Sequence, residues 1–195
     1  MGVADDPRVY DLIQLLAGGP VMDARLRRAL ADAAGALVLD VGAGTGKLAR
    51  LLPAGTTYWA LDEDPAKLRR LKAKVPRARR LPRSALETGL EDASVDWSVC
   101  VDVAHHLDDA QLPRLVAELA RITRERLVFV DALWTPRPSL GRVLWRNDRG
   151  AHPRTAERLL EALRNGFELE SVERFRAIHR YVLCVGRPRR AAAAA

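Results

Sequence analysis

The sequence predicts one α/β domain over residues 1–195, in which helices cover both faces of a mostly parallel sheet of seven strands. Three observations predict it. Short apolar runs alternate with segments of helical periodicity along the chain. The first run, residues 36–41, ends in glycines, as a buried strand of a parallel sheet commonly does. Two apolar runs near the end are joined by a short connection, which predicts an antiparallel hairpin at one sheet edge.

The predicted elements divide the chain into four parts. Residues 1–34 form a helical cover, because residues 5–33 carry leucines at helical spacing and Pro20 breaks the pattern. The core, residues 35–131, and the two later parts, 132–165 and 166–187, follow. We expect strands at 36–41, 57–61, 79–81, 95–101, 126–131, 167–175 and 179–185, and helices at 47–52, 65–74, 109–121 and 155–163.

Composition excludes several classes of protein. The chain is 48% apolar and 29% charged, as soluble globular domains are, and no apolar run approaches the roughly 18 residues that span a bilayer. The acidic N-terminus lacks the order of a secretory signal. Cys100 and Cys184 are far apart and form no CxxC pair, so neither a disulfide framework nor a zinc site is indicated. We therefore expect no metal, no membrane and a cytoplasmic location.

The net charge of +7 is compatible with two interpretations. A basic surface attracts nucleic acid. The surplus is mostly arginine scattered over amphipathic segments, with small clusters at 77–80 and 187–190, which a GC-rich coding bias explains as well. Both interpretations stay open at this point.

A glycine-rich turn follows the first predicted strand. Asp40 ends the strand, and Gly42, Gly44 and Gly46 leave the turn without side chains, so a ligand can lie against the backbone. A dinucleotide fingerprint would need glycine at Lys47, and the spacing of a Walker loop is absent. An acidic residue two positions before the first glycine suits a ligand with an ammonium group better than a pyrophosphate.

A second acidic cluster, Asp62-Glu63-Asp64, follows the second predicted strand. A carboxylate at that place can accept hydrogen bonds from both hydroxyls of a ribose. The glycine turn and this cluster occur in the right order and on predicted strand ends, so together they indicate a ligand that contains a nucleoside.

From about residue 37 to residue 131 the sequence resembles the class I S-adenosylmethionine-dependent methyltransferases of the small-molecule type, which have a Rossmann-like, doubly wound sheet. The resemblance implies S-adenosylmethionine as cofactor and S-adenosylhomocysteine as product, a cofactor-binding core at 35–131 and a substrate-side segment at 132–165. It also implies a cofactor site in which the residues that contact the methionine end, the ribose and the adenine are Asp40, Gly42, Ala43, Gly44, Gly46, Asp62, Glu63, Ser84, Ala85, Cys100 and Val101. The family commonly has Asp where this chain has Ser84.

Two residues are candidates for the chemistry. His105 lies just past the fourth predicted strand, at the carboxyl edge where such sheets bind ligands, so it is the candidate general base. Asp131 ends the fifth strand at the same edge and can orient a nucleophile. The alternative role for His105 is to pack against and cap the next helix, and the alternative for Asp131 is helix capping.

The segment after the fifth strand carries the candidate substrate residues Trp134, Trp145, Arg149 and His152, with Arg154 nearby. Aromatic and guanidinium groups suit a flat or apolar substrate that bears a carboxylate or a phosphate. The alternative is an amphipathic cover with tryptophans in the core and solvated arginines.

The function predicted is methyl transfer to a small molecule, an acidic or an aromatic or apolar metabolite, by a monomer or homodimer. One alternative is a nucleic-acid methyltransferase acting on RNA, although the (Asn/Asp)-Pro-Pro-(Tyr/Phe) run of exocyclic-amine enzymes is absent after the fourth strand. The other is a protein that binds the cofactor without transferring methyl.

Overall fold

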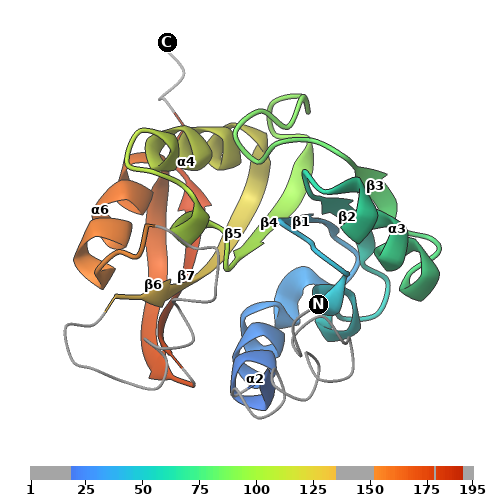
Figure 1. Ribbon diagram of the computed structural model, residues 1–195, viewed down its shortest axis with the longest axis horizontal. Coiled ribbons are helices and arrows are strands. Elements are labelled where there is room, and N and C mark those ends of the chain that lie inside the picture. Colours follow the sequence, from blue (N-terminus) through green and yellow to red (C-terminus); the bar gives the residue numbers. More distant parts are fainter. Residues whose placement is uncertain (1–18, 135–151, 178, 191–195) are drawn as a thin grey trace, which may run out of the picture.

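A computed structural model describes residues 19–134, 152–177 and 179–190 (Figure 1). Within these residues the centre is a sheet of seven strands in the order β3-β2-β1-β4-β5-β7-β6. The strands are β1 (Leu37–Val41), β2 (Thr57–Leu61), β3 (Arg79–Leu81), β4 (Val95–Val101), β5 (Thr123–Leu133), β6 (Phe167–Arg176) and β7 (Arg180–Pro188). The seven-stranded sheet predicted from the sequence is confirmed.

The pairing of the strands is mostly parallel. β1 pairs in parallel with β2 and with β4, and the same direction continues to β3 on one side and β5 on the other. β7 is antiparallel to both β5 and β6, which confirms the predicted edge hairpin. The strand order reverses between β1 and β4, and ligands of such sheets bind beyond the carboxyl ends of the strands at this switch point.

Side-chain caps mark the starts of two of the described helices. The helices are α2 (Gly19–Ala29), α3 (Pro65–Lys74), α4 (Gln111–Ile122) and α6 (Ala156–Gly166), with short 3-10 helices η2 (Ala31–Ala33), η3 (Lys47–Leu51) and η4 (Ala104–His106). Asp64 caps α3, because its Oδ1 accepts the Ala66 N–H at 2.7 Å, and Pro65 occupies the first turn, where it breaks no hydrogen bond. Thr155 caps α6 in the same way.

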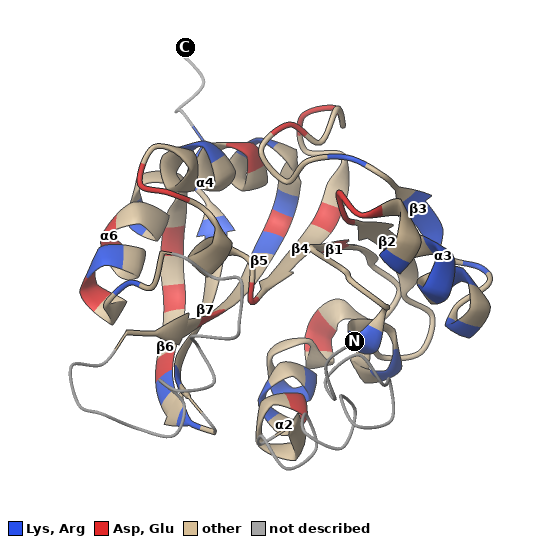
Figure 2. Cartoon of the chain, viewed as in Figure 1, with Lys and Arg blue, Asp and Glu red and all other residues tan. Residues whose placement is uncertain are grey.

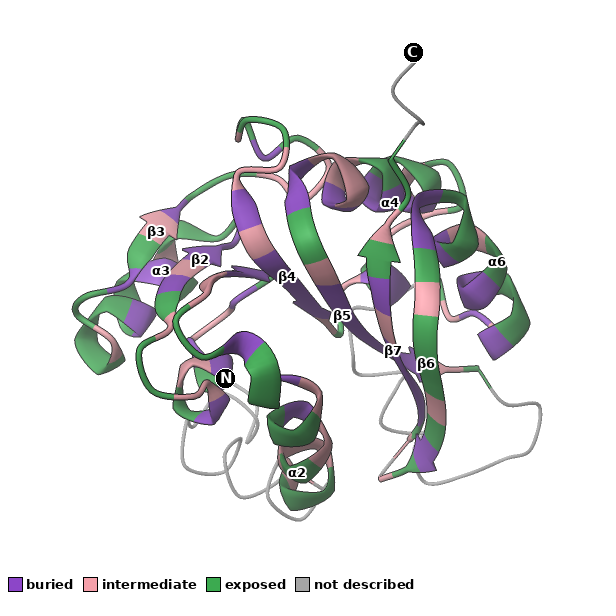
Figure 3. Cartoon of the chain, turned by 180° about the vertical axis from the view of Figure 1, so that it is seen from behind, coloured by how far each residue is buried: buried purple, intermediate pink, exposed green. Residues whose placement is uncertain are grey.

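Two apolar clusters lie on the two faces of the sheet. On one face Val38 of β1 packs with Leu26 of α2 and Leu71 of α3. On the other face Leu39 of β1 packs with the amphipathic helices α4 and α6. Since neighbouring strand residues point to opposite faces, β1 contributes to both clusters, and buried residues run along the central strands (Figure 3).

Several boundaries differ from those expected. The predicted helix at 47–52 is the 3-10 helix η3, and β5 extends beyond 126–131 at both ends. The N-terminal part of the expected cover, residues 5–18, lies outside the described residues, whereas α2 starts at Gly19 with Pro20 in its first turn. None of the helices in the described ranges is long and apolar enough to cross a membrane.

Candidate functional site

The glycine turn after β1 is folded tightly against β2 and β4. The backbone N–H groups of Gly42 and Ala43 both donate to the Leu61 carbonyl at the end of β2, at 2.8 and 2.9 Å. The φ of Gly42 is +75°, and a Cβ there would lie 2.4 Å from the Val103 side chain in the loop after β4. Gly46 has φ +80°, and a Cβ there would lie 2.8 Å from Leu71. These two positions therefore need glycine for packing.

Gly44 is different, because its exposed side faces no packed neighbour. With φ +54°, a Cβ built there would have the Gly42 carbonyl oxygen as its nearest heavy atom, at 3.9 Å. The Gly44 N–H donates to Asp62 Oδ2 at 2.8 Å. The turn thus presents bare backbone to an open space beside a carboxylate, which is the arrangement a ligand lying on the turn requires.

Asp62 stands at the end of β2 and joins the two sequence motifs. It is buried, its Oδ1 accepts the Asp64 N–H at 2.9 Å, and Lys67 Nζ lies 3.8 Å from the same oxygen. An ionised carboxylate has about four acceptor positions, so the two backbone donors leave capacity for two hydroxyl groups. Glu63 is exposed, so Asp62 is the acidic residue of this cluster that faces the turn.

Asp40 lies beneath the turn with a tyrosine partner. Its carboxylate is buried, and Tyr58 Oη of β2 donates to Asp40 Oδ2 at 2.6 Å. Burial raises the pKa of Asp40 to about 7, and burial likewise raises the pKa of Tyr58. Asp40 is therefore a carboxyl group that titrates near neutral pH, and a cation close to it would favour its charged form.

On the other side of the switch point, His105 and Asp131 form a buried pair. His105 Nδ1 lies 2.6 Å from Asp131 Oδ1, and the His105 backbone N–H donates to Asp131 Oδ2 at 3.1 Å. The Ala132 N–H also donates to Oδ1, at 2.7 Å. An imidazole that donates from Nδ1 to a carboxylate carries its lone pair on Nε2. The predicted catalytic residues are thus brought together in a geometry suited to proton transfer.

Asp102 adds a second carboxylate to this pair. It is exposed, follows β4, and has φ +56°, a left-handed conformation that is uncommon for residues other than glycine. Ligand atoms of Asp102, His105 and Asp131 lie within 4.8 Å of one another, so the three could together hold a metal ion. Both oxygens of Asp131 already accept N–H donors, which favours proton handling over metal binding.

Arg154 holds the turn that carries His105. Its side chain is buried, and its guanidinium donates to the carbonyl oxygens of Ala104 at 2.9 Å and Leu107 at 2.7 Å, on either side of His105. The same guanidinium donates to Asp109 at 2.9 Å. The sequence placed Arg154 among substrate-side or solvated arginines, and these contacts give it a positioning role instead.

The other predicted residues are spread along the same edge. Ser84 is half-buried, and its Oγ accepts the Leu86 N–H at 3.2 Å, so it shapes the loop after β3. Ala85 packs against the cluster under α4, and Val101 is half-buried. Cys100 is fully buried in β4, and burial raises the pKa of its thiol well above the ordinary value.

The substrate-side residues are described only in part. Trp134 is 42% exposed, and its backbone N–H donates to the Arg154 backbone carbonyl at 2.8 Å. His152 is exposed, and its backbone N–H donates to the His105 backbone carbonyl at 3.0 Å. Trp134 and His152 are thereby placed next to the His105 turn. Trp145 and Arg149 lie outside the described residues.

A family profile described as "Methyltransferase domain" matches residues 38–126, which include the glycine turn, Asp62 and His105. The match runs from β1 into β5. Residues 38–126 of this chain are therefore similar to a methyltransferase domain.

Proteins similar in sequence to part of this chain come from mycobacteria. Proteins described as uncharacterized methyltransferases of Mycobacterium tuberculosis and Mycobacterium bovis are 41% identical over 96 residues, which is 49% of this chain and 38% of each relative. The matched region thus spans less than half of the length of the curated relatives.

Solved structures share the fold at low sequence identity. A geranyl diphosphate C-methyltransferase from Streptomyces coelicolor A3(2), in complex with Mg²⁺, geranyl diphosphate and S-adenosylhomocysteine, has TM-score 0.71 and 15% identity over 87% of this chain and 80% of its own. A Pyrococcus horikoshii OT3 protein has TM-score 0.71 and 15% identity over 96% and 94%. The [4+2]-cyclase SpnF has TM-score 0.70 and 15% identity over 86% and 80%.

Two residues of the candidate site were not identified from the sequence. Tyr58 lies within an apolar strand, where its hydroxyl group gives no separate signal. The register Asp40↔Ala60 places this hydroxyl on the strand next to Asp40, so the pairing follows only once the register is known. Asp102 was not predicted as a site residue. It follows the end of its strand, as Asp62 does, and this position could have identified it.

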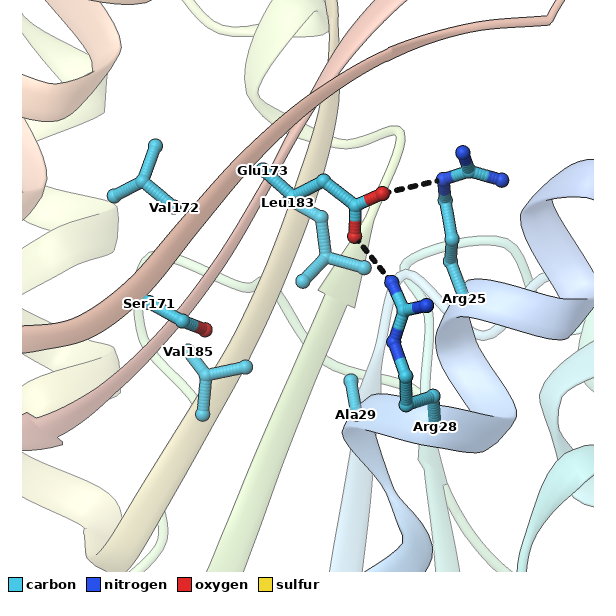
Figure 4. A pocket seen from close by; sticks show the side chains of 8 residues that line it. All are labelled: Arg25, Arg28, Ala29, Ser171, Val172, Glu173, Leu183 and Val185. Carbon is cyan, nitrogen blue, oxygen red and sulfur yellow. Dashed lines mark hydrogen bonds and ion pairs between the residues drawn. The ribbon is translucent and has the colours of Figure 1, made fainter.

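One hollow in the structure lies away from these residues. A cavity of about 280 Å³ opens between α2 and the β6–β7 hairpin (Figure 4). Arg25 and Arg28 both donate to Glu173 across it, at 2.9 and 2.5 Å, so the polar groups at its mouth satisfy each other. Its apolar wall includes Leu183, on the face of the sheet opposite to Asp131. The two ion pairs hold α2 against the hairpin, and none of the predicted site residues lines the cavity.

Proposed function

We propose that this chain is an S-adenosylmethionine-dependent methyltransferase with a small-molecule acceptor. The observation that carries the proposal is the hydrogen bond between Gly44 and Asp62. It brings the glycine turn and the acidic cluster to one place, at the carboxyl edge of β1 and β2, with open space above the backbone of Gly44. The similarity of residues 38–126 to a methyltransferase-domain profile supports the same interpretation.

The residues present fit the cofactor. Asp62 retains acceptor capacity for two ribose hydroxyls, and the bare turn at Gly44 admits a ligand against its backbone. Asp40, buried beneath the turn, favours an ammonium group nearby. Ser84 and Ala85 stand in the loop after β3, on the side where the adenine is expected. When bound, S-adenosylmethionine supplies an electrophilic methyl group.

His105 is placed to remove the proton of an acceptor hydroxyl or amine. Asp131 fixes the ring through Nδ1 and favours the charge that the ring gains when Nε2 takes a proton. Arg154 keeps the turn that carries His105 in position. The enzyme otherwise has to orient its acceptor, since methyl transfer is an in-line attack.

We infer an acidic or an aromatic or apolar metabolite as the acceptor. Trp134 and His152 are both exposed, and backbone hydrogen bonds hold them close to the His105 turn, so an aromatic and a polar residue lie near the candidate base. Methyltransferases acting on geranyl diphosphate share the fold, which supports the inference without naming this acceptor. A [4+2]-cyclase with the same fold supports the alternative that the scaffold serves another reaction.

The test is calorimetric titration of the full chain with S-adenosylmethionine and S-adenosylhomocysteine, with NAD as a negative control. We expect saturable binding of both ligands, lost or weakened at least about tenfold in Asp62→Ala, which corresponds to about 1.4 kcal/mol. Glu161→Ala, which removes an exposed carboxylate of α6, is the charge-matched control and should bind like the wild type. Absence of binding to folded wild-type protein overturns the proposal.

A second step separates transfer from binding. S-Adenosylhomocysteine formation is measured with panels of small carboxylic acids, phosphorylated metabolites and phenols, and separately with RNA. Turnover on a small acceptor supports the proposal. Turnover on RNA alone supports the nucleic-acid alternative, and cofactor binding without turnover on any acceptor supports a binding protein.

A further inference from the structure

The positive charge of the chain is concentrated in one window of the sequence. Nine Lys and Arg residues and no Asp or Glu lie between residues 65 and 86, so this window carries +9 whereas the whole chain carries +7. The remainder is therefore slightly acidic. Figure 2 shows these cations gathered over α3 and β3, at one edge of the sheet.

Among the residues that the structure describes, most of these cations have no carboxylate partner. The side chains of five exposed residues make no ion pair and no hydrogen bond with any residue in the described ranges: Arg69, Arg70, Lys72, Lys74 and Arg77. Elsewhere exposed arginines commonly face carboxylates, as Arg124 faces Asp96 and Arg187 faces Glu170. We define the basic face as these five residues together with Arg79 and Arg83.

Two ordinary explanations account for only part of the basic face. Arg79 lies on the edge strand β3, and charge on an edge strand prevents pairing with another sheet. Its guanidinium also lies 4.0 Å from the centre of the Trp59 ring, where it is held in place. The five unpaired residues lie on α3 or on the turn that follows it, so edge protection does not explain them.

We propose that the basic face binds the phosphate backbone of a nucleic acid, without reading its sequence. The ten residues of α3 span about 15 Å at 1.5 Å per residue, more than a small metabolite covers, so the matching anion is a polymer with repeated charges. Arginine, which predominates here, is suited to bidentate contacts with phosphate.

The composition of the basic face favours a nucleic acid over an acidic protein. Protein interfaces have an apolar core inside a polar rim. In the described part of the chain the large exposed apolar residues are Val21, Trp134 and Val172, and none of them lies on α3 or β3. A surface of cations without an apolar centre is the electrostatic footprint of a nucleic-acid-binding protein.

The basic face adjoins the cofactor side of the site and not the acceptor side. Lys67, on α3, lies 3.8 Å from Asp62. β3 is four strand positions from β5, which carries Asp131, or about 19 Å at 4.8 Å per strand. The inference therefore concerns docking, and it does not depend on methyl transfer or on cofactor binding.

The test is fluorescence anisotropy of the full chain with a labelled single-stranded RNA of mixed sequence, about 20 nucleotides long, in about 50 to 200 mM KCl. We expect a micromolar Kd that rises steeply with salt. A quadruple variant should bind at least about tenfold more weakly, with a slope of log Kd against log salt reduced by about 3, because each lost contact removes about 0.7. Its substitutions are Arg69→Gln, Arg70→Gln, Lys72→Gln and Lys74→Gln.

A matched variant removes the same charge from exposed arginines outside the basic face: Arg27→Gln, Arg114→Gln, Arg176→Gln and Arg180→Gln. Circular dichroism and thermal unfolding verify that both variants fold. Binding by the matched variant within about threefold of the wild type, with loss in the first variant, supports the proposal. Equal losses in both variants, or no binding by wild type at the lowest salt, overturn it. Equal displacement of the RNA by polyglutamate, at the same concentration of charge, also overturns it and assigns the face to an acidic protein.

Discussion

Replacing Gly44 by alanine tests whether a ligand lies on the glycine turn. The φ of Gly44 is +54°, so a Cβ carries a left-handed backbone penalty of about 1–2 kcal/mol. That Cβ meets no packed neighbour, because its nearest heavy atom is the Gly42 carbonyl oxygen at 3.9 Å. The loss in the free energy of unfolding should therefore be no larger than this backbone penalty.

A cofactor that contacts the turn adds a separate cost, which appears in the affinity and not in the stability. An added methyl in a filled site costs about 1–3 kcal/mol, which corresponds to about a 5- to 150-fold rise in Kd. Calorimetric titration with S-adenosylmethionine and S-adenosylhomocysteine measures this rise, and urea unfolding measures the change in the free energy of unfolding.

Gly35 provides the matched control. Its φ is +77° and a Cβ there has no heavy atom within 4 Å, so Gly35→Ala carries the same backbone penalty in equally open surroundings. We expect similar losses of stability in the two variants and a change in Kd only in Gly44→Ala. Unchanged binding by Gly44→Ala would mean that the ligand does not rest on the turn. Equal weakening in both variants would mean that the effect comes from lost stability.

Three further predictions follow from the site. Asp131→Asn should lower the rate of S-adenosylhomocysteine formation about 10²- to 10⁴-fold, with cofactor Kd unchanged, because His105 loses the charge that supports it; a rate near that of the wild type would exclude the pair from catalysis. Arg154→Ala should lower the free energy of unfolding by about 2–4 kcal/mol in urea titrations, because the buried Ala104 carbonyl and the partly buried Leu107 carbonyl lose their donor. Arg158→Ala, an exposed control, should cost less than about 0.5 kcal/mol. The pKa of Asp40 is raised from 3.8 to about 7, so the folded protein keeps a proton that the unfolded chain loses. As pH rises from about 4 to 7, the wild type should therefore lose on the order of 4 kcal/mol of stability relative to Asp40→Asn. Parallel curves of stability against pH for the two proteins would contradict the raised pKa.

The strands and the cofactor motifs were accessible from the sequence because their signals are local. A buried parallel strand is a short apolar run, and the turn after β1 needs glycine at 42 and 46 to avoid Val103 and Leu71. The order of the motifs placed Asp62 beside the turn, since strand ends of a parallel sheet meet at one edge. The same rule placed His105 near Asp131.

Long-range pairings could not be read in this way. The bond between Tyr58 and Asp40 depends on the register of β1 and β2, which the apolar pattern leaves undefined. The buried position of Arg154 depends on the return of the chain to the His105 turn after a long interval, and an arginine in sequence looks the same whether it is solvated or enclosed. The basic window at 65–86 was visible in the sequence, but only the structure shows that α3 and β3 join it into one surface.

The contacts of Arg154 with the end of β5 have a consequence for how this protein can diversify. The backbone N–H of Trp134 donates to the Arg154 carbonyl, and Leu133 forms a β-bridge with Arg154. The backbone N–H of His152 donates to the His105 carbonyl. The two ends of the intervening segment are therefore held at the same place, beside the His105 turn. Once the two ends are held together, doubling the length between them costs only about 0.6 kcal/mol of closure entropy. Insertions, deletions or grafts between residues 134 and 152 can therefore be exchanged without displacing His105, and acceptor preference can change while the proton-transfer pair stays where it is.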